Sequence, residues 1–500
     1  MIEPGRNPKP SCSGSFGWTG MLLLMACTLI TCTLISGCAM VGPDYTGHAP
    51  DSPEKWQADM DKGLDPDEPD QDQLSRWWDL FQDKTLSDLE QRAVKGNLDL
   101  KTAFSRLSQA RISRGLSRSD LFPTLDAGGQ FQRQRTSQSR PASYGPAVQD
   151  YYLSQFDSSW ELDMFGGIRR SVEAAQAELE ASSANVNDVL ISLMAEVAVN
   201  YTEVRTFQQR LAITRGNIKT QKKTYELNNS RYKSGLIDEL AVQQSLRNLE
   251  YTRSTVSRLE SGLIAAKNRL AVLLGLSPGA LEEELSPQGD IPDVPPYVAV
   301  GIPAEAMRRR PDIRRAERQL AAQTARIGVA VADLYPSFRL LGTIGIEALD
   351  AGGDFLSAKS RFWNIGPGIS WNIFHGNALR LNIDMQTEKQ KQALIAYKST
   401  VLHAQEEVED ALTAYAKEQM REEYLKKAVA AAKRTEWVAR DRYKAGLVTF
   451  YNVLDAQRAL LDLEDELIQS QGRVTANLAA LYKSLGGGWA FYNDFVQTTQ

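Results

Sequence analysis

Cysteine and histidine are scarce in this chain of 500 residues. All four cysteines lie within the first 38 residues, so a mature chain that begins at Cys38 could form no internal disulfide. The three histidines are His48, His375 and His403, and their spacing is not that of metal ligands. We therefore expect neither a disulfide nor a metal site, and the sequence indicates no other bound cofactor.

Long apolar runs, strong net charge and catalytic motifs are lacking as well. Charged residues make up 24% of the chain and are interspersed, which excludes a bundle of membrane-spanning helices. The net charge of −5 is mild and gives no reason to expect nucleic acid as a partner. No nucleophile–base grouping or nucleotide motif stands out, so we do not expect an enzyme. The glycine run at 486–488 is interpreted as a helix terminator.

Residues 1–37 have the pattern of an export signal: basic residues, the apolar stretch MLLLMACTLITCTLI and small residues at a cleavage site. The tetrapeptide ISGC resembles the bacterial lipoprotein signal, in which the cysteine becomes the lipidated first residue. Cys38 is therefore expected to carry diacylglycerol and an N-acyl chain such as palmitate, and Ala39 implies delivery to the outer membrane. A plain leader with an incidental Cys38 is the alternative, and either Met1 or Met21 could start translation.

One sequence motif of 19 residues occurs twice in the chain. RYKSGLIDELAVQQSLRNL begins at Arg231 and RYKAGLVTFYNVLDAQRAL begins at Arg442, with eight identities in 19 aligned positions. Residues 99–125 also align with 312–338 without a gap, at an offset of 213. The chain is therefore a tandem duplication. It divides into a signal peptide (1–37), an extended lipid-anchored segment (38–82), repeat 1 (83–285), a Pro-rich linker (286–302), repeat 2 (303–487) and a tail (488–500).

Each repeat is predicted to hold a helix, two strands, a very long helix and a return helix. The first helix ends at Leu-aromatic-Pro, because proline restricts the residue before it. No proline interrupts the long helix, which at about 1.5 Å per residue would reach roughly 100 Å. Gly235 or Gly446 then ends it, with basic residues just before the turn. The expected helices are 83–120, 168–232 and 238–275 in repeat 1, and 303–333, 377–443 and 449–485 in repeat 2.

The predicted strands each have one apolar and one polar face, because apolar and polar residues alternate along them. An open sheet cannot lie in lipid with unpaired edges, and four strands are too few for a membrane barrel. Several chains must therefore pool their strands, with the polar faces lining a lumen. The helices, too polar for lipid, would project into water. Trp160, Trp363 and Trp371 would suit the membrane interface, although packing beneath a barrel explains them equally well.

Three further stretches are typical of one family: WWDLFQD (77–83), RRPDIRRAE (309–317) and LAALYKSLGGGW (478–489). With these motifs the chain resembles the TolC/OprM outer-membrane factors, in particular the NodT-type lipoproteins that serve RND-type efflux pumps. The resemblance covers essentially the mature chain. It implies an α+β membrane protein whose protomer has long antiparallel helices and four strands. It also implies a homotrimer: a twelve-stranded barrel in the outer membrane, continued by a periplasmic helical barrel.

The resemblance also gives the repeated turns a role. In this family the periplasmic ends of the helical hairpins meet a membrane-fusion adaptor, which opens the channel; the inner-membrane RND pump acts through the adaptor or touches the tips. Simple helix capping is the alternative interpretation. The expected adaptor contacts are Arg231, Tyr232, Lys233, Ser234, Gly235 and Leu236, with Arg442, Tyr443, Lys444, Ala445, Gly446 and Leu447 in the second copy.

A gate is expected just past the second turn. Tyr451 and Asp455 are four residues apart, so they share a helix face. In the family that the chain resembles, the matching positions line the narrowest constriction, so a ring of Asp455 side chains would favour cations. Arg458 could pair with a neighbouring subunit's carboxylate and hold the closed state. Some relatives have a second Asp where this chain has Asn452, which predicts a less acidic ring. The alternative is a solvated face with a local Asp455–Arg458 pair.

The sequence thus predicts a passive outer-membrane exit duct for drugs or other small toxic compounds, within a tripartite efflux pump. A type I protein-secretion duct or a metal-efflux duct would share this architecture and stays open as an alternative. A coiled-coil lipoprotein without a pore is less favoured, because a spacer needs no amphipathic strands. The sequence does not name the exported compounds, since a duct accepts what its pump delivers.

Overall fold

The computed structural model describes residues 40–47, 49–58, 60, 63–65, 67, 74–135, 148–295, 297–349 and 355–489. The predicted signal peptide, Cys38 and His48 lie outside the described residues. The chain forms two compact units, and each combines segments of both repeats. The first unit comprises 1–45, 113–176 and 322–390, and the second comprises 46–112, 177–321 and 391–500.

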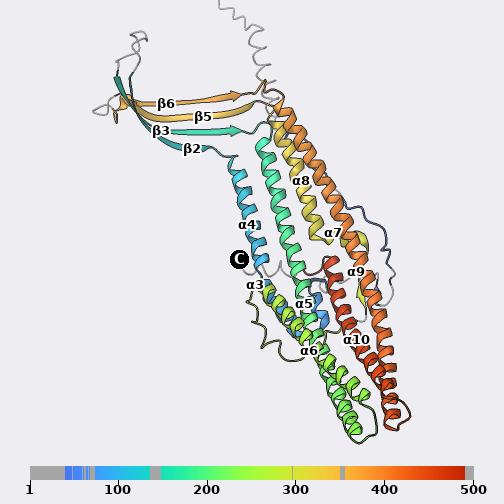
Figure 1. Ribbon diagram of the computed structural model, residues 1–500. Helices are drawn as coiled ribbons and strands as arrows, with labels where there is room; N and C mark the ends of the chain where they lie inside the picture. Colours follow the sequence, from blue (N-terminus) through green and yellow to red (C-terminus); the bar gives the residue numbers. More distant parts are fainter. Residues whose placement is uncertain are drawn as a thin grey trace, which may run out of the picture. The chain divides into compact units, whose positions relative to one another are not determined.

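The order of elements repeats along the chain (Figure 1). The long helices and return helices begin and end within two residues of the predicted bounds. None of the described helices combines the length and the apolar character needed to cross a membrane. Repeat 1 contains α3 (Lys84–Gly96), α4 (Leu98–Ser119), β2 (Thr124–Arg135), β3 (Val148–Leu162), α5 (Gly167–Lys233) and α6 (Glu239–Leu273). Repeat 2 contains α7 (Pro303–Arg309), α8 (Pro311–Ala332), β5 (Ser337–Ala348), β6 (Arg361–Ser370), α9 (Ala378–Lys444) and α10 (Phe450–Ser484).

The prediction of one helix over 83–120 and one over 303–333 is wrong, because each is two helices. Asn97 separates α3 from α4, and its side-chain oxygen accepts from the Leu100 N–H at 2.8 Å as an N-cap. Arg310 separates α7 from α8 and has an extended backbone, as expected for a residue before proline.

Within the second unit, the residue at each of these two breaks contacts the C-terminal end of a return helix. The Asn97 side-chain amide donates to the Leu273 carbonyl at the end of α6, 2.9 Å away. At the corresponding place in repeat 2, the Arg310 guanidinium donates to the Ser484 carbonyl at the end of α10, 2.7 Å away. A polar side chain at each break thus satisfies a carbonyl that the neighbouring helix leaves open.

The first unit contains an antiparallel sheet in the order β2-β3-β5-β6. Its register aligns apolar residues across all four strands: Ala127 pairs with Phe156, Phe156 with Ile344, and Ile344 with Trp363. Since neighbouring residues point to opposite faces, the next row is polar. That row is Asp126, Asp157, Thr343 and Asn364. The predicted separation into an apolar and a polar face is confirmed.

Two of the three predicted tryptophans tie the sheet to the turns that precede its hairpins. The Trp160 indole N–H donates to the Leu121 carbonyl at 2.9 Å, and the Trp371 indole N–H donates to the Leu334 carbonyl at 3.0 Å. Both acceptors belong to the Leu-aromatic-Pro motif that ends the preceding helix. All three rings are exposed in the single chain, Trp363 of β6 the most.

The main hydrophobic core belongs to the second unit and holds helices of both repeats with the η1 segment Trp77–Phe81. Trp77 is buried and stacks on Tyr482 of α10, with ring centroids 5.5 Å apart. The WWDLF motif is therefore a packing element of the core.

Two short strands, β1 (Leu64–Asp65) before repeat 1 and β4 (Val298–Ala299) in the linker, belong to the same unit and pair in parallel.

Candidate functional site at the helical tips

The repeated motif forms the two turns that join α5 to α6 and α9 to α10 (Figure 1). In the first turn the Leu236 N–H donates to the Arg231 carbonyl at 2.9 Å, and the Gly235 N–H donates to the Tyr232 carbonyl at 2.8 Å. This pair of bonds is the Schellman arrangement, which requires a left-handed residue. Gly235 supplies it with a φ of 70°, as Gly446 does in the second turn with a φ of 77°.

The second turn is built on a small apolar cluster of its own, formed by Tyr443, Phe450, Val453 and Leu454. The rings of Tyr443 and Phe450 lie 5.6 Å apart, and the Tyr443 hydroxyl donates to the Asn228 side chain of α5 at 2.9 Å. This hydrogen bond satisfies the polar end of a ring that is only 7% exposed. Tyr443 therefore supports the turn from inside.

The first turn presents its aromatic residue to solvent. Tyr232 is 43% exposed, and Leu236 and Leu240 beside it are exposed as well. Lys233 is also exposed, as are Arg442, Lys444 and Leu447 of the second turn. The two tips together offer exposed apolar side chains beside charges of both signs, since Asp238, Glu239 and Asp441 are exposed as well.

Arg231 joins the two tips. Its guanidinium lies over the Tyr443 ring, 5.2 Å from the centroid, and donates to the Lys444 carbonyl at 3.2 Å. The second bond helps to satisfy a carbonyl at the C-terminal end of α9, where a positive charge is favoured. One side chain of repeat 1 thus caps the long helix of repeat 2.

The expected gate residues lie on one face of α10. Tyr451 is 64% exposed, and Asp455 and Arg458 are exposed beside it. The opposite face, with Val453 and Leu454, is buried in the apolar cluster. Among the described residues of this single chain Asp455 has no hydrogen bond or ion pair, so its carboxylate is free to face another subunit.

Arg458 has a partner that the sequence did not indicate. Its Nε donates to the side-chain oxygen of Asn248 in α6, 3.1 Å away, and the local pair with Asp455 is not among the ion pairs of the described residues. This bond ties the return helices of the two repeats together near the tips. Asn248 and Asn228 were both missed, because their counterparts at the offset of 211 are Ala459 and Ala439.

A model of the outer membrane efflux protein family matches residues 89–276 and 302–487, which is most of the chain. The chain belongs to this family. It is 30% identical over 466 residues to nodulation protein T of Rhizobium leguminosarum bv. trifolii, covering 91% of this chain and 96% of that protein. It is 29% identical to the toluene efflux pump outer membrane protein TtgC of Pseudomonas putida, covering 92% and 94%.

Solved structures agree with this membership. The outer-membrane channel OprN superposes with a TM-score of 0.85 at 35% sequence identity, covering 90% of this chain and 100% of that one. The predicted fold class, outer-membrane localisation and efflux role are thereby confirmed. The protein is an outer-membrane efflux component whose helices extend into the periplasm.

Proposed function

We propose that three copies assemble into a continuous exit duct and that the helical tips form its adaptor-controlled gate. The apolar row of the sheet supports assembly, because Phe156, Ile344 and Trp363 are exposed in the single chain. Lipid would cover this face once the edge strands β2 and β6 pair with neighbouring copies. Pooling four strands from each of three copies gives a closed barrel of about twelve strands, within the range known for membrane barrels.

The expected lipid on Cys38 fits this arrangement. The Val41 N–H, three residues on, donates to the Phe165 carbonyl at 3.1 Å, just after β3 ends at Leu162. The chain is therefore fastened to the end of the sheet within a few residues of Cys38. A lipid there would enter the same membrane that the strands cross, adding an anchor to a spanning element.

The tips suit an adaptor whose contact surface is partly apolar and carries polar or charged groups around it. Tyr232, Leu236 and Leu447 provide exposed apolar contacts, and exposed Lys233 and Lys444 provide the charge. Apolar anchors surrounded by charge are typical of protein interfaces, in which the centre provides affinity and the rim provides orientation. Tyr443 acts behind this surface, since its ring is buried in the single chain.

The gate rests on one observation: the Asp455 carboxylate is exposed and unpaired, among the described residues, on the face opposite the apolar cluster. Three such carboxylates around a symmetry axis would narrow the duct and attract cations. The Arg458–Asn248 bond would hold α10 against α6 in the closed state. Opening by the adaptor would separate these helices, with no chemistry by the duct itself and with energy from an inner-membrane pump.

The substrates would be those that the pump delivers. The relatives include proteins named for toluene, antibiotic and pyoverdine export, so membership of the family does not by itself specify one exported compound. We assign this chain to the export of small compounds, with the choice of compound made by the pump and only a preference for cations at the Asp455 ring. A pore-free spacer is disfavoured because the sheet keeps one apolar and one polar face through all four strands.

Planar-bilayer conductance tests the gate. Wild-type protein should give small, flickering currents with cation preference, and Asp455→Ala should raise the conductance several-fold and weaken that preference. Gln244→Ala is the matched control, because Gln244 occupies the same position on α6 at the offset of 211. Large steady currents in all three proteins would support the duct but contradict the proposed gate. Silent bilayers with correctly folded protein would favour the spacer.

A further inference from the structure

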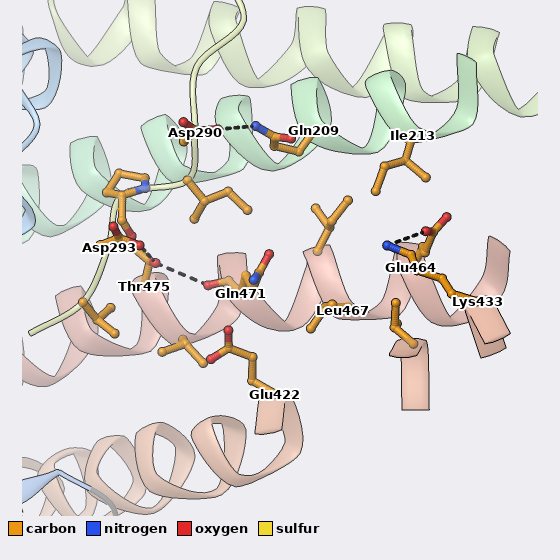
Figure 2. Close-up of a pocket in the computed structure, with 16 residues that line it drawn as sticks. Gln209, Ile213, Asp290, Asp293, Glu422, Lys433, Glu464, Leu467, Gln471 and Thr475 are labelled. Atoms are coloured by element: carbon orange, nitrogen blue, oxygen red, sulfur yellow. Dashed lines mark hydrogen bonds and ion pairs between the residues drawn. The ribbon is translucent and has the colours of Figure 1, made fainter. Parts of the chain in front are cut away.

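A pocket of about 390 Å³ lies within the second unit, under the linker that joins the repeats (Figure 2). Its size falls in the range of small-molecule sites, roughly 300–1,000 Å³. Helices α5, α9 and α10 provide three sides, and linker residues 290–294 cross one end. The pocket is therefore built from both repeats and from the segment between them.

The linker is fastened on both sides of the pocket, so this wall is preformed. The Thr475 hydroxyl of α10 donates to the Pro292 carbonyl at 3.0 Å. The Gln209 side-chain amide of α5 donates to Asp290 at 2.9 Å (Figure 2) and also, at 3.1 Å, to the carbonyl of Gly289. A preformed wall lowers the entropy cost of binding.

Carboxylates dominate the polar lining. Of the five charged side chains, four are acidic and only Lys433 is basic. Glu464 is already paired with Lys433 at 3.3 Å, and Glu422 is paired with Lys426 at 2.8 Å. Asp293 has no hydrogen bond or ion pair among the residues that the structure describes. The acidic members are Asp290, Asp293, Glu422 and Glu464.

The remaining lining is largely apolar. Ile213 of α5 and Leu467 of α10 line the pocket (Figure 2). Val429 of α9 adds a third aliphatic side chain to the lining. An anion would be repelled by Asp290 and Asp293, which form no ion pair among the described residues. A small inorganic cation would leave the aliphatic wall uncovered. Only a ligand with an apolar body and a positive charge satisfies both parts of the lining.

We propose that this pocket binds a small organic cation, with its apolar body between α5 and α10 and its charge toward Asp293. The site lies in the wall of the helical unit. Its occupancy does not depend on Asp455, so it can be tested whether or not the gate at the tips operates as described above.

Equilibrium dialysis of the full-length detergent-solubilised protein against ethidium tests the proposal, with the same micelles on both sides. Asp293→Asn should weaken binding about three- to tenfold, the effect of removing one charge a few ångströms from the ligand. Leu467→Trp should abolish binding by filling the pocket. Asp410→Asn, an exposed change of equal charge on α9, should leave the affinity unchanged.

Two comparisons make the outcome decisive. The anionic fluorophore 1-anilinonaphthalene-8-sulfonate and uncharged phenanthridine should bind at least tenfold more weakly than ethidium. Equal binding of phenanthridine would show that the carboxylates contribute nothing and would overturn the proposal. Wild-type ethidium affinity in Asp293→Asn would also overturn the proposal, whatever Leu467→Trp shows. Asp293→Asn changes a single exposed linker side chain, so the test stands even if Leu467→Trp fails to fold.

Discussion

The same tyrosine is exposed in one repeat and buried in the other. Tyr232 and Tyr443 occupy equivalent positions in turns with identical hydrogen-bonding patterns, yet only Tyr443 is enclosed. Asn228 offers Tyr443 an acceptor, whereas its counterpart in repeat 2 is Ala439 and offers none. The shared residues thus set the backbone of each turn, and the unshared neighbours set the environment of its side chains.

The starts of the long helices differ in the same way. The Arg170 side chain in α5 is 2% exposed, whereas its counterpart in α9, Leu381, is exposed. Arg170 donates to the Val41 carbonyl at 3.1 Å and forms ion pairs with Asp44 at 2.6 Å and Glu173 at 2.8 Å. It therefore holds the N-terminal segment, for which repeat 2 has no equivalent at this position.

Of the substitutions that test these differences between the repeats, Arg170→Ala should have the largest effect on local stability. It removes a buried guanidinium whose hydrogen bonds to charged groups are worth about 1.5–3 kcal/mol each, so the total cost should be about 3–5 kcal/mol although Asp44 and Glu173 stay accessible to water. Opening of residues 40–45 should become a hundredfold or more easier, measured as faster amide hydrogen exchange. Leu381→Ala should change exchange at its own site only slightly. Unchanged exchange at 40–45 in Arg170→Ala would show that other contacts fix this segment.

Tyr443→Ala against Tyr232→Ala tests the difference between the tips directly. Truncating the buried ring should cost about 3 kcal/mol, because it opens a cavity beside Phe450 and leaves Arg231 without its aromatic partner. Amide exchange over 443–454 should rise about a hundredfold. Truncating the exposed ring should change stability by about 0.5 kcal/mol. Equal effects at the two positions would mean that both rings are enclosed in the working protein.

Glu90 gives a third contrast, since the offset of 213 places Pro303 at its position in repeat 2. Glu90 is fully buried in α3, and neither carboxylate oxygen has a hydrogen-bond partner in the described part of the chain. Burial raises the pKa of Glu90 well above its ordinary value. The folded protein therefore keeps a proton there that the unfolded chain releases once the pH exceeds about 4.3.

The sign of the pH effect follows from this difference in protonation. Stability from this site is greatest below the unfolded pKa and falls as the pH rises, until the pH passes the raised pKa. Glu90→Met should stabilise the neutral-pH protein by about 1–3 kcal/mol and flatten this dependence. Denaturant unfolding at pH 5 and pH 8 measures both effects, with the exposed Glu196→Met as control. A destabilised Glu90→Met protein would indicate an unobserved partner for the carboxyl group.

Much of the protomer was predictable because its strongest constraints are local. Glycine at 235 and 446 ends the long helices, and alternation along the strands assigns their faces. The breaks at Asn97 and Arg310 were missed although local signs exist. Asn97 is an N-cap and Arg310 precedes a proline, and both were hidden by the apolar periodicity that runs across them.

The contacts between the repeats could not be predicted in this way. Asn248 meets Arg458 across 210 positions of sequence, and Asn228 meets Tyr443 across 215. The equivalent position in the other repeat holds alanine in both cases, so a comparison of the two repeats could not identify either asparagine. Such pairs depend on which faces of two long helices pack together, and periodicity within one helix does not specify its partner.

Arg231→Lys should have the smallest effect and is the most specific test of the link between the tips. Lysine keeps the charge but cannot stack its planar group over Tyr443 while also donating to the Lys444 carbonyl. The loss should be about 0.5–1 kcal/mol, the strength of an exposed cation–π contact. Exchange at 443–447 should rise about three- to fivefold. Arg442→Lys, at the equivalent exposed position, should leave exchange in both tips unchanged. If the two variants behave alike, charge alone stabilises the tips, and the cap that repeat 1 places on α9 has no energetic role.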